Sequence, residues 1–275
     1  MTFSVNTNPG ALIALQNLNV TQAQLQTTQN QISTGLAVAT AQDNGAIYAI
    51  AQNQRSQVSA LDSVRQSLQR AQSTLDVATS AGSSISDLLN QLKATALSAS
   101  DTSLDTNSRL ALNASFTSLR DQISKVVQNA DFNGANLIKS GATSILALAN
   151  ADGTSQLTIQ SQSLALGGSI ITLASTASIS SVTLAGTALT TINTDITNVN
   201  NALAQLGAAA NAVSTHLTFI GDLQDTISSG IGNLVNADLA KDSANLQALQ
   251  TKQQLGVQAL SIANSGSSAL LSLFR

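Results

Sequence analysis

Apolar side chains recur every seven residues along most of this chain, and this spacing limits the fold more than any other feature of the sequence. The repeat is almost unbroken over residues 61–99 and returns over residues 189–227, with two apolar positions in each seven. Such positions form a seam along one side of an α-helix, and the seam is stable when a second helix packs lengthwise against it. At 1.5 Å per residue each helix would be about 58 Å long, whereas helices of globular domains average about 11–12 residues. The sequence therefore predicts a mainly α fold, an elongated antiparallel bundle of two long helices matched in length.

A third helix and two breaks are predicted around these long helices. The turn at 101–105 leads into a helical pattern that ends at Ala130, before the turn sequence Asp-Phe-Asn-Gly. Residues 39–54 are predicted to be a break, because they contain the turn sequence Asp43-Asn44-Gly45; a helix on either side of this turn stays open. Residues 228–234, which include two glycines, are predicted to be a linker to the last helix.

Residues from about 140 to 186 differ from the rest of the chain and predict a small β-rich insert. Apolar and small polar residues alternate over 145–149 and 156–168. Asn150 to Gly153 lie between these runs, which is typical of a β-hairpin. Further short strands are predicted at 169–175 and 180–186.

The two ends of the chain carry matching amphipathic helices. Asn8-Pro9 reads as an N-cap followed by proline in the first turn, and Gly35 reads as the helix stop. The C-terminal helix, 237–275, has the same seven-residue seam, interrupted by Gln253 and Gly256. A weakly charged helix with one apolar stripe needs a partner to be stable. We expect the two ends to meet and to pack against other subunits; the alternative is that each end folds back on its own bundle.

Composition argues against several classes of function. Charged residues make up 9% of the chain, against roughly 25% in globular proteins, and none of the 14 acidic residues is Glu. The 11 basic residues are scattered, so no patch exists for nucleic-acid phosphates. The chain has no Cys, no apolar run of about 18 residues and no basic stretch of a secretory signal near its start. His216 is the single histidine, and no metal set or catalytic constellation can be assembled around it. We therefore expect no enzyme activity, no cofactor, no bound metal, no nucleic acid and no membrane.

Four segments carry a resemblance to a known family. They are SVNTNPGALIALQNLN (4–19), QISTGLAVATAQDNGA (31–46), DFNGANL (131–137) and the C-terminal helix from NADLAK to LLSLFR. Together, and in this order, they resemble bacterial flagellin. The short middle is similar to the compact flagellins of alphaproteobacteria such as Caulobacter.

This resemblance implies a subunit that polymerises with itself into the extracellular flagellar filament that drives swimming. It implies an inner-tube domain built from 1–40 and 236–275, and a helical rod domain, 41–235, that carries the insert. It also implies contacts with other flagellins and with hook-associated and cap proteins. Export would run through the flagellar type III apparatus, with an export chaperone and without a cleaved signal. The residues expected to pack in the filament core are Leu18, Leu25, Ile32, Leu246, Leu249, Leu260, Leu270 and Phe274.

Two other functions stay open from the sequence. A hook–filament junction protein shares the terminal helices of flagellin and adapts the filament without growing into a long polymer. An exported helical binding or adhesin protein would remain monomeric or form a closed oligomer. The extent of the C-terminal match favours flagellin.

Overall fold

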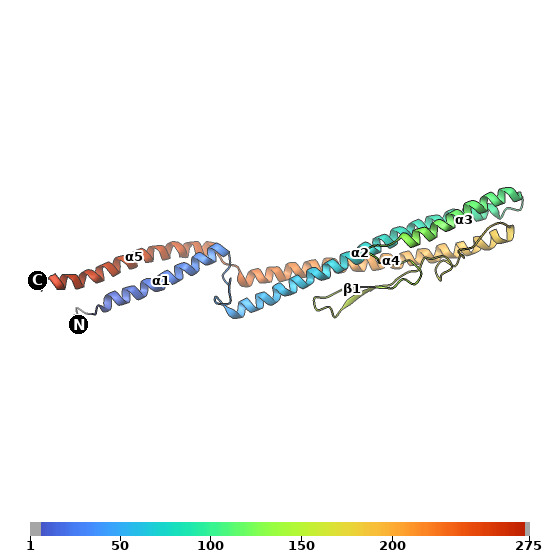
Figure 1. The fold of residues 1–275 in the computed structure, drawn as a ribbon. Helices are drawn as coiled ribbons and strands as arrows, with labels where there is room; N and C mark the ends of the chain where they lie inside the picture. Colours follow the sequence, from blue (N-terminus) through green and yellow to red (C-terminus); the bar gives the residue numbers. More distant parts are fainter. Residues whose placement is uncertain (1–6, 273–275) are drawn as a thin grey trace. The chain divides into compact units, whose positions relative to one another are not determined.

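The computed structural model describes residues 7–272, and the side chains of residues 7–265. The described part contains five helices and one two-stranded sheet (Figure 1), which confirms the predicted mainly α fold with a small hairpin. The elements are α1 (Pro9–Thr34), α2 (Gly45–Ala99), α3 (Thr106–Asn129), β1 (Ile145–Leu148), β2 (Gln156–Ile159), α4 (Val182–Val235) and α5 (Leu239–Ser272). The chain divides into two compact units. One is 57–225, and the other joins the described residues up to Ser56 with those from Thr226 on.

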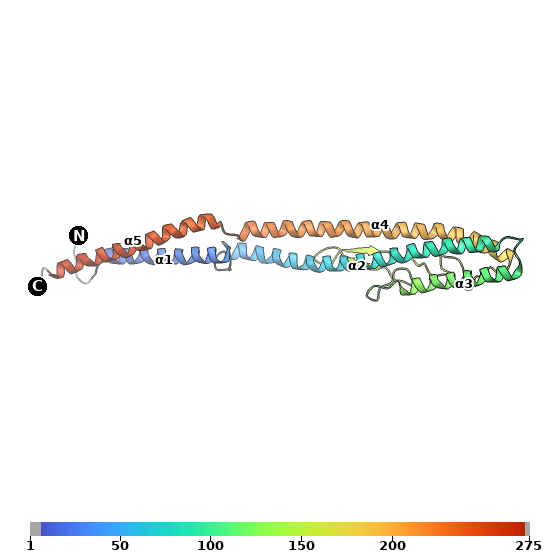
Figure 2. The ribbon, with the colours of Figure 1, turned by 90° about the horizontal axis from the view of Figure 1, so that it is seen from above.

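The core of the 57–225 unit is the seam that the seven-residue repeat predicts. Leu68, Leu75 and Leu89 of α2 are fully buried, as are Ile192 and Val199 of α4. The two helices run antiparallel, side by side (Figure 2), because Gly82 meets Leu203 while Gln224 donates a hydrogen bond to the Val58 carbonyl at 3.3 Å. Helix α3 adds a third apolar stripe to this core, formed by Phe116, Ile123 and Val127.

Gly82 is the one glycine among the seam positions of α2. The space left by its missing side chain is filled by a leucine of α4. A Cβ at this position would lie 2.6 Å from Leu203 Cδ2 and 3.5 Å from Leu164 Cδ1. Real side chains do not approach so closely, so the missing Cβ allows α2 and α4 to come together here. The glycine costs helix propensity but permits tighter packing of the seam.

The insert is fastened to the helices by polar contacts. β1 and β2 pair antiparallel, from Ile145 opposite Ile159 to Leu148 opposite Gln156. The His216 ring nitrogen Nε2 lies 2.8 Å from the Ala149 carbonyl at the end of the hairpin.

Asp195, on α4, holds the loop that follows the hairpin. Its carboxylate is fully buried and accepts hydrogen bonds from the Thr172 backbone, the Thr172 hydroxyl and the Leu173 backbone at 2.8–3.0 Å. These three donors compensate the burial of the carboxylate, which would otherwise be unfavourable.

Helix α2 begins before the predicted repeat. The predicted turn is present at 41–43, and the residues of 39–54 from Gly45 on are helical, which is the alternative left open on that side. Asn44 caps the helix by accepting a hydrogen bond from the Ile47 backbone at 3.1 Å. Helical structure therefore starts at Gly45 and continues into the predicted seam. The end of the sequence read as a turn is therefore the start of a helix.

Helix α4 extends beyond the predicted repeat at both ends. Residues 180–186, predicted as a strand, contain its first turn, and residues 228–234, predicted as a linker, are helical up to Val235. The glycines at 230 and 232 do not break α4, because Ile231, Leu234 and Val235 pack in a small apolar cluster. Residues 169–175 form no strand; a single bridge between Leu166 and Ile171 is their only β-type pairing, and the second hairpin strand ends at Ile159.

Filling the hole at Gly82 should destabilise the 57–225 unit. We expect Gly82→Leu to lower the free energy of unfolding by about 1–3 kcal/mol, because the new side chain overpacks the seam against Leu203. The matched control is Gly207→Leu on α4, where a Cβ meets nothing within 4 Å. Urea unfolding followed by circular dichroism measures both; equal stabilities for the two variants would contradict this role for Gly82.

Removing the charge of Asp195 should release the loop. Asp195→Asn replaces one acceptor oxygen with a donor, so we expect a loss of about 2–3 kcal/mol in the free energy of unfolding. Asp87→Asn, on the exposed side of α2, is the control and should change stability by less than about 0.5 kcal/mol. A stable Asp195→Asn variant with an unchanged amide spectrum for Thr172 and Leu173 would refute this assignment.

Candidate assembly surface on the terminal helices

Helices α1 and α5 lie side by side and antiparallel (Figures 1 and 2). The predicted caps of α1 are confirmed. Asn8 accepts a hydrogen bond from the Ala11 backbone at 3.1 Å, Pro9 starts the helix, and Gly35 ends it in the left-handed region with φ +70°. Across the pair, the Asn8 side chain also donates to the Ala263 carbonyl at 2.7 Å.

Most of the residues predicted to pack in the filament core lie on the stripes by which α1 and α5 are paired within one chain. Leu18 and Leu249 are each 8% exposed. Four others are half-buried on the same stripes: Leu25, Ile32, Leu246 and Leu260. Leu270 lies in α5 beyond the described side chains, and Phe274 lies outside the described residues.

The seam between α1 and α5 is thin. It contains small and polar residues such as Thr28, which is buried, and Gln253, which is half-buried. An open groove of about 480 Å³ lies between the helices beside Thr28 and Leu249. A helix pair with so few large buried side chains gains little from its own packing.

The outward sides of the pair carry a second set of apolar residues. Ile13 and Val20 of α1 are 59% and 51% exposed, and they lie seven residues apart. Leu255 and Ile262 of α5 are 59% and 72% exposed, and they too lie seven residues apart. Each terminal helix therefore has an outer apolar stripe in addition to its seam stripe. Such a stripe is the pattern that packs against a further helix.

These exposed residues form two flanks of the pair. At 100° per residue, Ile13 and Val20 lie on one side of the α1 seam, whereas Leu12 and Leu15 lie on the other. The same geometry applied to the antiparallel α5 places Leu255 and Ile262 on one side of its seam and Val257 on the other. We call the set Ile13, Val20, Leu255 and Ile262 the first flank, and the set Leu12, Leu15 and Val257 the second flank.

The sequence reading missed both flanks, because it followed one seam per helix. The signal was present, since two apolar residues spaced by seven also occur off the seam of each terminal helix.

A clamp joins the ends of α1 and α5 nearest the linkers. Leu36 and Asn236 form an antiparallel bridge, the Ala37 backbone donates to the Val235 carbonyl at 2.7 Å, and the Ala237 backbone donates to the Gly35 carbonyl at 2.9 Å. Beside these hydrogen bonds, a plug of apolar side chains closes the unit: Val38, Ala51 and Val235, with Leu36, Ile47, Tyr48, Ile231 and Leu234 around them.

Asp43 shapes the linker that leads from the clamp to α2. Its carboxylate accepts hydrogen bonds from the Thr40 backbone at 2.8 Å, the Thr40 hydroxyl and the Ala39 backbone. These bonds, the Thr40 backbone first, hold the pKa of Asp43 below its usual value of 3.8.

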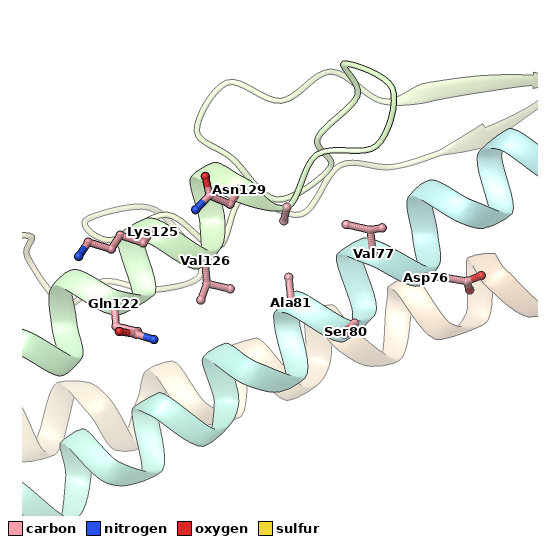
Figure 3. Close-up of a pocket in the computed structure, with 9 residues that line it drawn as sticks. Asp76, Val77, Ser80, Ala81, Gln122, Lys125, Val126 and Asn129 are labelled. Carbon is pink, nitrogen blue, oxygen red and sulfur yellow. The ribbon is translucent and has the colours of Figure 1, made fainter.

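A groove of about 720 Å³ lies in the 57–225 unit, between α2 and α3 (Figure 3). Its lining mixes apolar and polar residues, and Asp76 and Lys125 are the charged side chains among them. These lining residues include no histidine or cysteine and do not form a nucleophile with a base. Among the described residues, no cluster of side chains suits a metal ion. No helix in the described part is both long and apolar enough to span a membrane.

Comparison with known proteins identifies the family. The model of the bacterial flagellin N-terminal helical region matches residues 5–143, and that of the C-terminal helical region matches residues 189–274. The chain belongs to the flagellin family. Flagellin FljO of Caulobacter vibrioides is 54% identical over 272 residues, covering 99% of this chain and 98% of that protein. A flagellin of Brucella melitensis is 36% identical over 281 residues, covering 99% of both.

Solved structures share the fold at low sequence identity. A flagellar hook-associated protein from Vibrio parahaemolyticus superposes with a TM-score of 0.60 at 14% identity, over 70% of this chain and 100% of that one. Bacillus cereus flagellin gives a TM-score of 0.50 at 22% identity, over 56% and 88%. As a flagellin, the chain is a structural subunit of the bacterial flagellar filament. The resemblance stated from the sequence is confirmed.

The turn at Asp43 should open in acid. Because its pKa is lowered by folding, the stabilisation it provides is present above the ordinary value of about 3.8 and is lost as pH falls through the folded-state pKa. We expect the amide signals of Ala39 and Thr40 in nuclear magnetic resonance spectra to titrate together, with a midpoint below 3.8. The Asp43→Ala variant should show no such titration. A midpoint at or above 3.8 in the parent chain would contradict this assignment.

Proposed function

We propose that paired α1 and α5 form the filament-core domain of this flagellin, and that their two apolar flanks contact different neighbouring copies of the chain. The terminal segments 1–40 and 236–275 then make the inner tube, and 41–235 makes the rod with its insert at about 140–186. The presence of exposed apolar residues on both sides of one helix pair is the observation that carries this proposal.

Two different flanks suit an open polymer. A closed dimer of twofold symmetry buries one self-complementary patch, whereas a growing filament needs one patch that fits a different patch on the next subunit. Ile262 and Ile13, on the first flank, are more than half exposed, and so are Leu12 and Val257 on the second. Burial of each such side chain contributes about 1.5–3 kcal/mol to association.

The seam residues have a separate role in this proposal. Leu18, Leu25 and Leu249 hold α1 against α5 within the subunit, and the flanks join subunits. Leu270 and Phe274 continue the C-terminal stripe by their spacing in the sequence. The thin seam supports this division, because the pair needs cover from neighbours to be stable.

Other partners follow from the same surface. Apolar flanks that are exposed before assembly need protection, which supports an export chaperone, and delivery as an unfolded chain through the flagellar type III apparatus avoids exposing them at all. Other flagellins, hook-associated proteins and cap proteins would meet the flanks at the ends of a filament. In this role the protein works outside the cell through contacts alone, with no enzymatic step and no cofactor.

A charge on the first flank should stop filament growth without unfolding the subunit. Ile262 is 72% exposed, so Ile262→Asp removes little intrachain packing but places a carboxylate in the proposed interface. We expect the critical concentration for growth from short filament seeds to rise at least tenfold, equivalent to about 1.4 kcal/mol or more. Electron microscopy of seeded growth measures it.

The matched control is Ile262→Leu, which keeps the flank apolar and should grow within about threefold of the parent chain. Growth of Ile262→Asp at the parental critical concentration would remove the first flank from the interface. A parent chain that stays monomeric on its own seeds would instead favour the binding or adhesin alternative.

A further inference from the structure

We propose that Gly256 is a positioning residue of assembly: it forms the hole that receives Leu18, and this contact sets the alignment of α5 on α1. The inference rests on the proposed role of the two flanks, because its consequence is to bring flank residues of both helices level. Gly256 interrupts the seam in the sequence, as Gly82 does in the other helix pair.

The contact between Gly256 and Leu18 is close. A Cβ at residue 256 would lie 3.3 Å from Leu18 Cδ1 and 3.9 Å from Leu18 Cβ. Leu18 is one of the few buried leucines of the pair, at 8% exposure. A leucine at 256 would need to occupy the space that Leu18 already fills.

The seam positions on both sides of this contact match in steps of three and four residues. Ala14 lies four residues before Leu18 in α1, and Leu260 lies four residues after Gly256 in α5, so the two residues are level along the antiparallel pair. In the other direction, Thr28 comes level with Leu246. In these layers a large residue faces a smaller one, as Leu18 faces Gly256. A shift of one heptad that placed Leu18 against Leu249 would leave Gly256 opposite Ala11, so no large side chain would fill the space at the glycine.

No charge pairing can set this alignment, because the described part of α1 contains no charged residue. The clamp at Leu36 and Asn236 joins the ends nearest the linkers. The nearest first-flank residue on α1, Val20, lies 16 residues from Leu36, about 24 Å along the helix. Over that distance the contact of Leu18 with Gly256 and the Asn8 hydrogen bond to Ala263 hold the two helices together in the alignment that begins at the clamp.

The alignment brings the first flank together. From the contact between Leu18 and Gly256, Val20 lies two residues along α1 and Leu255 lies one residue in the same direction on α5. The two side chains are therefore level to within about 1.5 Å, and the same count places Ile13 level with Ile262 to within about 1.5 Å. A slip of one heptad would separate them by about 10.5 Å and divide the flank into two unmatched halves.

The test first places a leucine at residue 256, where it competes with Leu18 for space, and then exchanges the large and the small residue between the two helices. Gly256→Leu should raise the critical concentration for seeded growth at least tenfold. The double variant Leu18→Ala with Gly256→Leu places the large residue on α5 and the small one on α1, and it should return the critical concentration to within about threefold of the parent. Gly221→Leu on α4, where a Cβ meets nothing within 4 Å, is the control for the effect of a new leucine in a helix.

Disulfide trapping reports the alignment directly, since the chain has no Cys of its own. The first cysteine pair, Ala14→Cys with Leu260→Cys, lies on the side of Gly256 away from the clamp. The second pair, Thr28→Cys with Leu246→Cys, lies between Gly256 and the clamp. In filaments of chains that carry one of these cysteine pairs and keep Leu18 and Gly256, both pairs should cross-link within one chain. Under Gly256→Leu the first pair should lose most of its cross-linking while the second keeps it, and the double variant should restore the first.

The outcomes separate this inference from the proposed function. Two results would show that Gly256 does not set the alignment: growth of Gly256→Leu at the parental critical concentration, or failure to grow while both cross-links still form. In either case the proposed role of the flanks is still tested separately, by the Ile262 variants. If the double variant fails to restore the first cross-link, the knob-and-hole contact is also overturned. The inference is established if Gly256→Leu loses both filament growth and the Ala14–Leu260 cross-link, and the double variant recovers both.

Discussion

The close approach of antiparallel helices, made possible where a leucine of one helix meets a glycine of the other, is the constraint on which this structure depends. Leu203 fills the space at Gly82 between α2 and α4, and Leu18 does the same at Gly256 between α1 and α5. The chain has few charged residues, so ion pairs contribute little to the choice of partner or register. The pairs Asp62–Arg65 and Arg120–Asp121 are local, within α2 and α3. Shape therefore carries the specificity that charge provides in ordinary coiled coils.

The same principle produces different results in the two units. In the 57–225 unit the seam is filled by fully buried leucines and isoleucines, and a third helix and the insert cover it. In the terminal unit the seam is built from small and polar residues, and comparable apolar side chains face outward. This distribution supports the proposed division, in which the 57–225 unit is stable alone and neighbouring subunits complete the terminal pair.

The long seams, the caps at Asn8 and Gly35 and the hairpin could be predicted from the sequence, because each depends on local spacing or on one turn. The start of α2 could not, because Asn44 caps a helix there instead of making a turn between helices. The end of α4 could not, since packing in the apolar plug, which joins distant segments, overrides the glycines at 230 and 232. The role of Asp195 also required the fold, because its donors lie more than 20 residues away. For the assembly surface, spacing located the seam, but only the paired helices revealed which apolar residues remain outside it.

The hydrogen bond from Asn8 to Ala263 joins residues 255 positions apart in the chain. Because synthesis begins at one end, α1 is made first and its partner α5 is made last. The terminal pair can therefore close only around a finished polypeptide, and a chain that stops early leaves α1 without its match. If the paired ends form the filament core as proposed, their antiparallel meeting makes a complete chain the condition for entering the polymer.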